Sequence, residues 1–469
     1  MQAQEAHQLA SHLIFLAASK QTRPPPRRHT LSRPLHQLAS PVRPPVSASS
    51  SGAATMDPPC KQDAEESASS SLPDELIEDI FARMPAKSAQ RCRCLSRAWA
   101  ATLSSRSFVD RHLLLANRRG SPRLFILPEL GTDTDTTMHG WSPGRPMVVL
   151  RREERLRGAV SVTTQCRGLV VLKSTGLVDV CFHGDSSCNP DYYVCNPSTG
   201  QMTTLPRGKE AFGLFPHNHD VLGIGYDASI QKHKVVRLYC RGLLPPACEV
   251  YVLNSSSGHW RPPFGAADRA LPPGFARSIC TDQSVFAQGH LYWTGQPHRK
   301  FNSQMIIISF SISDEVFEIL PPPPMDMFPC RITELDGCLC VFNNTDKYKH
   351  SYDIWVLRDH RAGTWDLHCR IALDMAPLAD TQLIRSQEVI PLGSVDDGSG
   401  ILLRSDPHSV WKENLEAHRL HVYRPVTGDV EDLLGDDSVT THHTMARGVA
   451  VPYVESLEST GLSDTKRQS

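Results

Sequence analysis

The residues best suited to hold a metal ion are the cysteines, and their spacing argues against a metal site. The chain of 469 residues contains 14 cysteines, none of them in a C-x-x-C pair. Cys92 and Cys94 are separated by one residue, as are Cys338 and Cys340, and neither pair has a second pair of ligands nearby. Structural zinc normally needs four ligands in closely spaced pairs. We therefore predict reduced thiols, no bound metal and no cofactor.

Side chains that could catalyse a reaction are present but isolated from one another. His442 and His443 lie in a polar stretch, where histidines are typically solvated turn residues. Asp396 and Asp397 are flanked by Gly and Ser, as in a surface loop. The chain has no G-x-S-x-G, H-E-x-x-H, Walker or dinucleotide-binding motif. The sequence therefore predicts a protein that is not an enzyme.

Composition excludes two further classes of partner. The chain has 49 Lys and Arg against 50 Asp and Glu, a formal net charge of -1 and a pI near 7.1, so nothing in its overall charge attracts nucleic acid. No apolar run approaches the roughly 18 residues that a membrane-spanning helix needs. We predict a large buried core and neither nucleic-acid nor membrane binding.

The elements most in need of a partner are short helices between Leu72 and Gly120. Apolar residues recur at helical spacing on one side of the first helix, while acidic residues fall on the other; the apolar set is Leu76, Ile77, Ile80, Phe81 and Met84. Pro73 suits a first turn and Pro85 ends the helix. Further helices are predicted through Lys87–Leu95, Trp99–Leu103 and Phe108–His112. So short a segment cannot bury this stripe alone, which predicts a docking module.

This segment closely resembles the F-box motif. The matching positions are Leu72, Pro73, Leu76, Ile80, Pro85, Lys87, Ser88, Arg91, Arg93, Ser96, Trp99 and Phe108. Two positions depart mildly, since Cys94 replaces a usual aliphatic residue and Arg97 a usual lysine. The resemblance implies that residues 71–119 bind the Skp adaptor of cullin-based ubiquitin ligases. The adaptor-binding residues it implies are Leu72, Pro73, Leu76, Ile77, Ile80, Met84, Pro85, Ser88, Cys92, Leu95 and Trp99.

Residues 1–70 differ in composition from the rest of the chain. Proline runs and a serine run are followed by an acidic, Ser-rich patch, which predicts a disordered segment. The acid-poor, arginine-bearing beginning also suits a transit peptide. A further alternative is that translation starts at Met56. Because cullin ligases work in the cytoplasm and nucleus, the F-box resemblance favours those locations.

From residue 120 to 457 the sequence changes to short β-rich runs separated by Gly, Pro, Asn and Asp. A degenerate repeat of strands and turns recurs every 45 to 60 residues or so, roughly the length of a four-stranded propeller blade. The six units are Arg123–Leu150, Cys166–Pro206, Gly223–Trp260, Gly289–Pro321, Leu335–Trp365 and Ile401–Gly428. The first is one strand short, so Ala446–Val454 is expected to complete it and remove an open sheet edge. We predict a six-bladed β-propeller and a disordered tail at 458–469; a β-sandwich pair or an irregular barrel is the alternative.

These repeat segments resemble the F-box-associated domain of plant-type F-box proteins. The resemblance rests on Tyr193–Gly200, Gly225–Asp227, Gly289–Trp293 and Tyr453–Leu457. It implies a kelch-like propeller that binds a target protein while the F-box binds the Skp adaptor and, through it, cullin. The expected function is substrate recognition in a ubiquitin ligase, with no catalysis of its own. A propeller enzyme and an F-box scaffold or transcriptional partner outside the ligase remain alternatives.

Overall fold

A computed structural model gives the fold of the protein. It describes residues 72–118, 122–128, 136–153, 156, 160–174, 190–209, 220–239, 247–264, 284–295, 306–324, 330–346, 351–372, 387–395, 398–407, 419–433 and 448–461. The predicted disorder of residues 1–70 therefore lies outside the described residues. The chain divides into two compact units at Phe81, and helices α3–α5 and all the sheets belong to the second unit.

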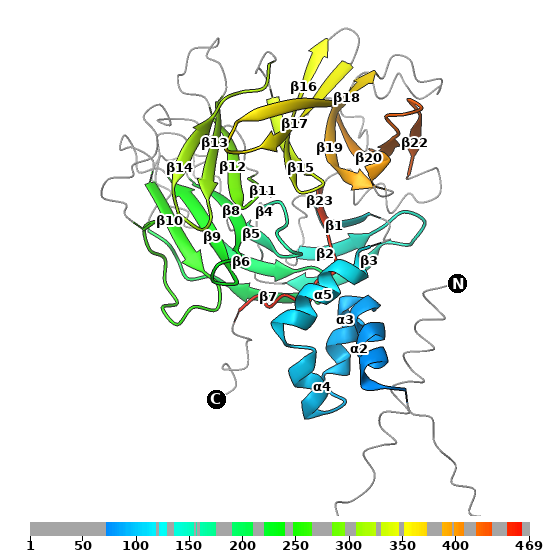
Figure 1. The fold of residues 1–469 in the computed structure, drawn as a ribbon, viewed down its shortest axis with the longest axis vertical. Helices are drawn as coiled ribbons and strands as arrows, with labels where there is room; N and C mark the ends of the chain where they lie inside the picture. Colours follow the sequence, from blue (N-terminus) through cyan, green and yellow to red (C-terminus); the bar gives the residue numbers. More distant parts are fainter. Residues whose placement is uncertain are drawn as a thin grey trace, which may run out of the picture. The chain divides into compact units, whose positions relative to one another are not determined.

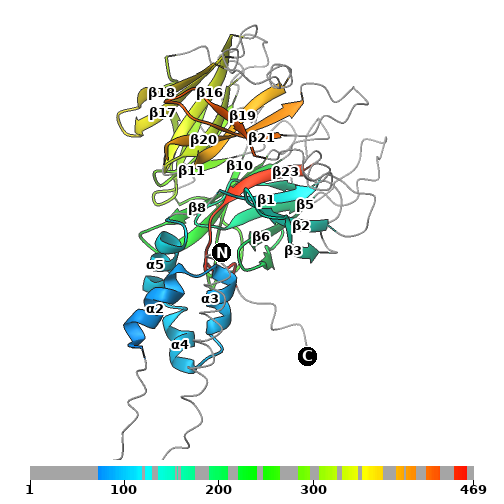
Figure 2. The same cartoon turned by 90° about the vertical axis from the view of Figure 1, so that its right-hand side faces the viewer.

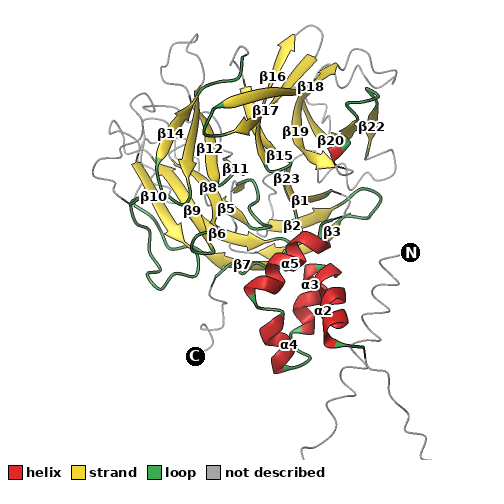
Figure 3. Cartoon of the chain, viewed as in Figure 1, coloured by secondary structure: helices red, strands yellow, loops and turns green. Residues whose placement is uncertain are grey.

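Four helices form the first described part of the chain, drawn in red in Figure 3: α2 (Asp74–Arg83), α3 (Ala86–Cys92), α4 (Arg97–Thr102) and α5 (Arg106–Ala116). Serine side chains cap two of them, because Ser96 Oγ accepts from Trp99 N at 3.1 Å and Ser105 Oγ accepts from Phe108 N at 3.2 Å. Pro85 precedes α3 and offers no capping side chain. No helix in the described ranges is long and apolar enough to cross a membrane.

Six antiparallel sheets follow the helices, as Figure 1 shows, and confirm the predicted six-bladed β-propeller. Blade 1 contains β23 (Gly448–Tyr453), β1 (Arg123–Pro128), β2 (Thr136–Trp141) and β3 (Val148–Glu153). Blade 2 contains β4 (Val160–Val162), β5 (Val170–Ser174), β6 (Asp191–Asn196) and β7 (Gln201–Thr204). Blade 3 contains β8 (Asp220–Asp227), β9 (Lys232–Tyr239) and β10 (Ala247–Val252). Arg261 adds an isolated bridge to Val250 beyond β10.

The other three blades each have four described strands. Blade 4 has β11 (Val285–Ala287), β12 (His290–Gly295), β13 (Ile306–Ser311) and β14 (Phe317–Leu320). Blade 5 has β15 (Cys330–Leu335), β16 (Cys338–Asp346), β17 (Ser351–Asp359) and β18 (Thr364–Ala372). Blade 6 has β19 (Gln387–Val395), β20 (Gly400–Pro407), β21 (Arg419–Tyr423) and β22 (Val430–Asp432).

Alternation along each strand divides the core among the blades. On β1, Leu124 and Ile126 pack against blade 6, whereas Phe125 and Leu127 pack against blade 2. Successive side chains of a strand point to opposite faces, so a strand between two neighbouring blades must be apolar on both. Six buried clusters of this kind lie between consecutive blades. This explains why the strands read as nearly continuous apolar runs.

Strand β23 closes the ring, as predicted from the missing strand of the first unit. It pairs antiparallel with β1 from Arg123↔Tyr453 to Pro128↔Gly448, and Figure 2 shows the two strands side by side. Ala450 packs with the blade 6 cluster, and Val451 with the blade 2 cluster. The last strand of the chain therefore covers the inner edge of β1 and packs its side chains against blades 6 and 2.

Candidate functional site

The residues predicted to bind the adaptor divide into an exposed and a buried set. Leu72 and Leu76 are 41% and 52% exposed, unusually high values for leucines, and Pro73 and Pro85 are exposed as well. Half-buried members are Ile77, Ile80, Ser88, Leu95 and Trp99. Leu72 lies just before α2 and Leu76 in its first turn, and exposed leucines grouped in this way are typical of a surface that another protein covers.

Met84 and Cys92, in contrast, are buried within the chain itself. Both belong to the protein's own core, and the backbone oxygen of Met84 lies 2.9 Å from His112 Nε2, also buried. Burial raises the pKa of Cys92 to about 11, so its thiol stays protonated. Their side chains therefore pack inside the chain, and their part in adaptor binding stays a prediction.

A C-terminal strap, residues 454–461, runs between the helices and the propeller, and sequence reasoning missed its role. The predicted domain boundary was 457, but the described chain continues to Gly461, with Glu458 and Thr460 both buried. Asn196 Nδ2 donates to the backbone oxygens of Ser456 and Glu458 at 3.0 and 2.9 Å. The strap is thereby fixed to blade 2.

The strap also supplies the missing cap of α3. Glu455 Oε2 accepts a hydrogen bond of 2.7 Å from Ala86 N, the first amide of that helix, although the two residues are 369 positions apart. A carboxylate at a helix N-terminus satisfies a free N–H and interacts favourably with the helix dipole. The side chain of Asn117, just after α5, bonds the backbone of Glu455 twice: Asn117 Oδ1 accepts from Glu455 N at 2.8 Å and Asn117 Nδ2 donates to Glu455 O at 2.9 Å. One residue thus contacts both α3 and the end of α5.

Glu458 is the centre of an ionic network that joins α5 to blade 2. Its Oε1 accepts from Arg106 Nη2 and Arg167 Nε at 2.8 Å each, and both arginines also pair with Asp110 on α5. The guanidinium groups of both arginines lie over the ring of Tyr226. Burial alone would raise the pKa of Glu458, but the hydrogen bond from Arg106, the field of His233 and the hydrogen bond from Arg167 lower it below the ordinary value of 4.5.

The turn that presents Arg167 depends on a glycine. Gly168 has a φ of +84°, and a Cβ built there would lie 2.3 Å from Ser456 Cβ and 2.9 Å from Val454 O. Only glycine allows the strap to approach the β4–β5 turn this closely.

We expect Glu458→Gln to lower the free energy of unfolding by about 2 to 4 kcal/mol, because two partly buried arginines lose a shared charge partner. Since the pKa of Glu458 is lower in the folded protein, its contribution is present above about pH 4.5 and is lost as the pH falls through the folded value. Thermal melts from pH 7 to 3.5 should therefore show a smaller decrease for the variant than for the wild type. Equal pH dependence would contradict this role.

Buried charges elsewhere in the propeller resemble an active site but are fully paired. Lys173 Nζ and Arg237 Nε lie 2.5 and 3.0 Å from the two carboxylate oxygens of Asp220, and the Tyr192 hydroxyl donates to the same group. Burial would raise the pKa of Asp220, yet Lys173 and Arg237 lower it. A carboxylate held ionised by two cations is a poor general acid or base, so this group joins blades 2 and 3.

A second network joins blades 3 and 4 in the same way. Lys234 Nζ lies 2.8 Å from Asp227 Oδ2 and 2.8 Å from Glu315 Oε1, and Arg261 donates to both oxygens of Glu315. Within the described ranges, no group of three or more His, Cys, Asp or Glu side chains could hold a metal ion. The predicted histidine pair at 442 and 443 and the aspartates at 396 and 397 lie outside the described residues.

The strand connections separate the two faces of the propeller. In blades 2, 4, 5 and 6, one face of the propeller holds two kinds of connection: those from the first to the second strand and those from the third to the fourth. This is the face that carries the strap, because in blade 2 Arg167 and Ser198, which lie in such connections, bond to the strap. These connections are short, for example 197–200, 288–289 and 336–337. On the opposite face lie the ends of β5, β7 and β18, which longer stretches of sequence separate from the strands that follow them.

Comparison with known proteins identifies relatives of both parts of the chain. The F-box domain family matches residues 69–111, and the F-box associated beta propeller domain family matches residues 150–409. A putative F-box/kelch-repeat protein of Arabidopsis thaliana is 26% identical over 319 residues, which cover 61% of this chain and 68% of that protein. F-box protein CPR1 of the same plant is 25% identical over 319 residues, covering 62% of this chain and 70% of that protein.

A further relative, F-box protein DOR of Arabidopsis thaliana, is 23% identical over 311 residues, covering 63% of this chain and 73% of that protein. Among solved structures, TolB from Acinetobacter baumannii superposes with a TM-score of 0.41 and 10% identity over 75% of this chain and 73% of that chain. That score is too low to inform either the fold or the function.

Proposed function

Because the chain belongs to the plant-type F-box proteins that carry an F-box associated β-propeller domain, we propose that it is the substrate-recognition subunit of a Skp/cullin/F-box ubiquitin ligase. Members of this family are typically non-catalytic adaptors. The observation that carries the proposal is the pair of exposed leucines in the F-box, Leu72 just before helix α2 and Leu76 on it, in a chain that also carries a six-bladed propeller.

The mechanism we propose is proximity. The F-box binds the Skp adaptor and through it cullin, while the propeller binds the target. Helices α3 and α5 are fixed to blade 2 by the strap and by Glu458, so a target held by the propeller keeps a defined position relative to these helices. Pre-organised geometry of this kind favours repeated transfer to the same region of the target.

We place the target on the propeller face opposite the strap. The strap, α5 and the short turns of blade 2 cover one face, whereas the longer connections leave from the other. Loops on a rigid scaffold carry most binding functions because they can vary without cost to the core. We also propose that the protein works in the cytoplasm or nucleus, where cullin ligases are found, which a fluorescent fusion to the full chain would test.

The experiment that tests the proposal is reconstitution with purified components. The full chain, co-expressed with a Skp adaptor, should elute as a 1:1 complex in size-exclusion chromatography, and this complex should bind a cullin. Failure to bind the adaptor would overturn the proposal. Adaptor binding without incorporation of cullin would favour the alternative of a scaffold outside the ligase. Proximity labelling with and without residues 71–119 would then identify targets that depend on the F-box.

A further inference from the structure

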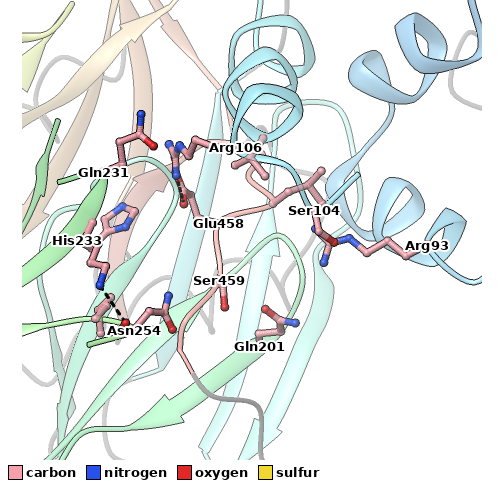
Figure 4. Close-up of a pocket in the computed structure, with 13 residues that line it drawn as sticks. Arg93, Ser104, Arg106, Gln201, Gln231, His233, Asn254, Glu458 and Ser459 are labelled. Atoms are coloured by element: carbon pink, nitrogen blue, oxygen red, sulfur yellow. Dashed lines mark hydrogen bonds and ion pairs between the residues drawn. The ribbon is translucent and has the colours of Figure 1, made fainter. Parts of the chain in front are cut away.

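A cavity of about 390 Å³ lies where the helices, blades 2 and 3 and the strap meet (Figure 4). Cavities that bind small molecules begin at about this size. Its lining is mostly polar: Arg93 and Ser104 come from the helical part, Lys232 and His233 from β9, and Glu458 from the strap. In Figure 4, Arg93 extends from one side while Gln231 and His233 lie on the other.

The charge of this lining is unbalanced. Three cations, Arg93, Arg106 and Lys232, face it against one carboxylate, Glu458. Arg106 is satisfied by Glu458 and by Asp110. The excess positive charge therefore belongs to Arg93 and Lys232.

Neither of these two cations has a carboxylate partner among the described residues. Arg93 Nη2 donates to Leu103 O at 3.0 Å, while its Nε is buried with no partner. Lys232 Nζ donates to Asn254 O at 3.2 Å. By contrast, the buried cations Lys234 and Arg237 each bind two carboxylates. A half-buried guanidinium without a counter-ion is costly, which points to an anion supplied from outside the chain.

His233 adds a neutral side chain to the same lining. The residue is only 4% exposed, its Nε2 is enclosed by the chain, and the ring bonds to the backbone of Cys166. Burial lowers the pKa of His233 to about 4, so the imidazole is neutral at physiological pH. The ring therefore adds no charge to the lining, which leaves the excess positive charge to the two cations.

We propose that this cavity binds a small phosphorylated molecule that carries hydroxyl groups, with Arg93 and Lys232 supplying the positive charge and the side-chain amides of the lining facing the hydroxyls. Guanidinium and ammonium groups are the usual partners of phosphate. The three side-chain amides Gln201, Gln231 and Asn254 provide further polar contacts. Such a ligand would touch the helices, the propeller and the strap at once.

Isothermal titration of the full chain with glucose 6-phosphate, inorganic phosphate and glucose tests the proposal. We expect saturable binding of glucose 6-phosphate, weaker binding of phosphate and none of glucose. Arg93→Met and Lys232→Met should each weaken glucose 6-phosphate binding at least tenfold. Arg145→Met, which removes an exposed arginine from the β2–β3 turn, is the matched control and should bind like the wild type.

Two results would overturn the proposal. One is the absence of saturable binding by both phosphate compounds in the wild type. The other is binding that Arg93→Met and Lys232→Met leave unchanged, which would place the anion elsewhere on the surface. Circular dichroism melts verify that each variant is folded. Because no adaptor is present in the titration, its outcome is independent of the proposed ligase function.

Discussion

A chain that ends at Asp437 should accumulate as insoluble aggregate, although the deletion leaves the F-box and all strands of blades 2 to 6 in the chain. It removes β23, whose six residues pair with β1, and with it the buried side chains of Val451 and Tyr453. Each such loss from a core costs about 2 to 5 kcal/mol, comparable in sum to the entire stability of a typical domain. The inner edge of β1 is left without a partner and becomes a template for pairing between chains.

Two longer truncations serve as controls. A chain ending at Gly461 keeps β23 and the strap, and we expect it to be soluble and to melt cooperatively at the wild-type temperature. A chain ending at Tyr453 keeps the closed ring but lacks Glu455 and Glu458, so it should stay soluble and melt earlier. Solubility and calorimetry in one buffer compare all three. A soluble Asp437 chain with a single sharp melt would refute the closure by β23.

Replacing Leu72 and Leu76 together by alanine should abolish capture of the Skp adaptor while leaving the fold unchanged. Both side chains are strongly exposed, so their truncation removes little internal packing. If they are covered by the adaptor, each is expected to contribute about 2 kcal/mol or more, as central interface residues do. The affinity should then fall roughly a thousandfold.

The matched control is Leu114→Ala on α5, which removes a leucine that is 72% exposed but stands outside the implied binding set. It should bind the adaptor like the wild type. Biolayer interferometry with an immobilised adaptor measures all three proteins, and thermal melts verify their folding. Unchanged affinity in the Leu72, Leu76 double variant, or an equal loss in the Leu114 variant, would show that α2 is not the docking surface.

The local elements of this fold were predictable because their causes are local. Pro73 and Pro85 bound the first helix, and capping serines precede α4 and α5. The closing strand was predictable because the first repeat unit was one strand short and an apolar run that could supply this strand stood near the end of the sequence. The six blades were predictable from the spacing of the repeated strands. Each repeat contains an apolar run, such as residues 169–172, whose side chains pack on both faces of the strand.

The strap was not predictable from the sequence. Glu455 and Glu458 are ordinary acidic residues in a polar stretch, and their partners Ala86 and Arg106 lie more than 350 positions away. Nothing in the local spacing distinguishes a carboxylate that caps a distant helix from one that is solvated. The burial of Met84 and Cys92 could not be read from the sequence for a related reason, because an apolar stripe does not reveal which of its members pack inside the chain.

The cap of α3 by Glu455 has a consequence for the order of synthesis. Ala86 leaves the ribosome early, whereas its partner follows 369 residues later. At about 5 to 20 residues per second, the helices wait roughly 20 to 70 s for this contact, and β23 closes the ring only a few residues before it. A chain whose synthesis stops before residue 448 thus has an α3 without this cap and a propeller without β23, so both parts are completed only once residues 448–455 have been made.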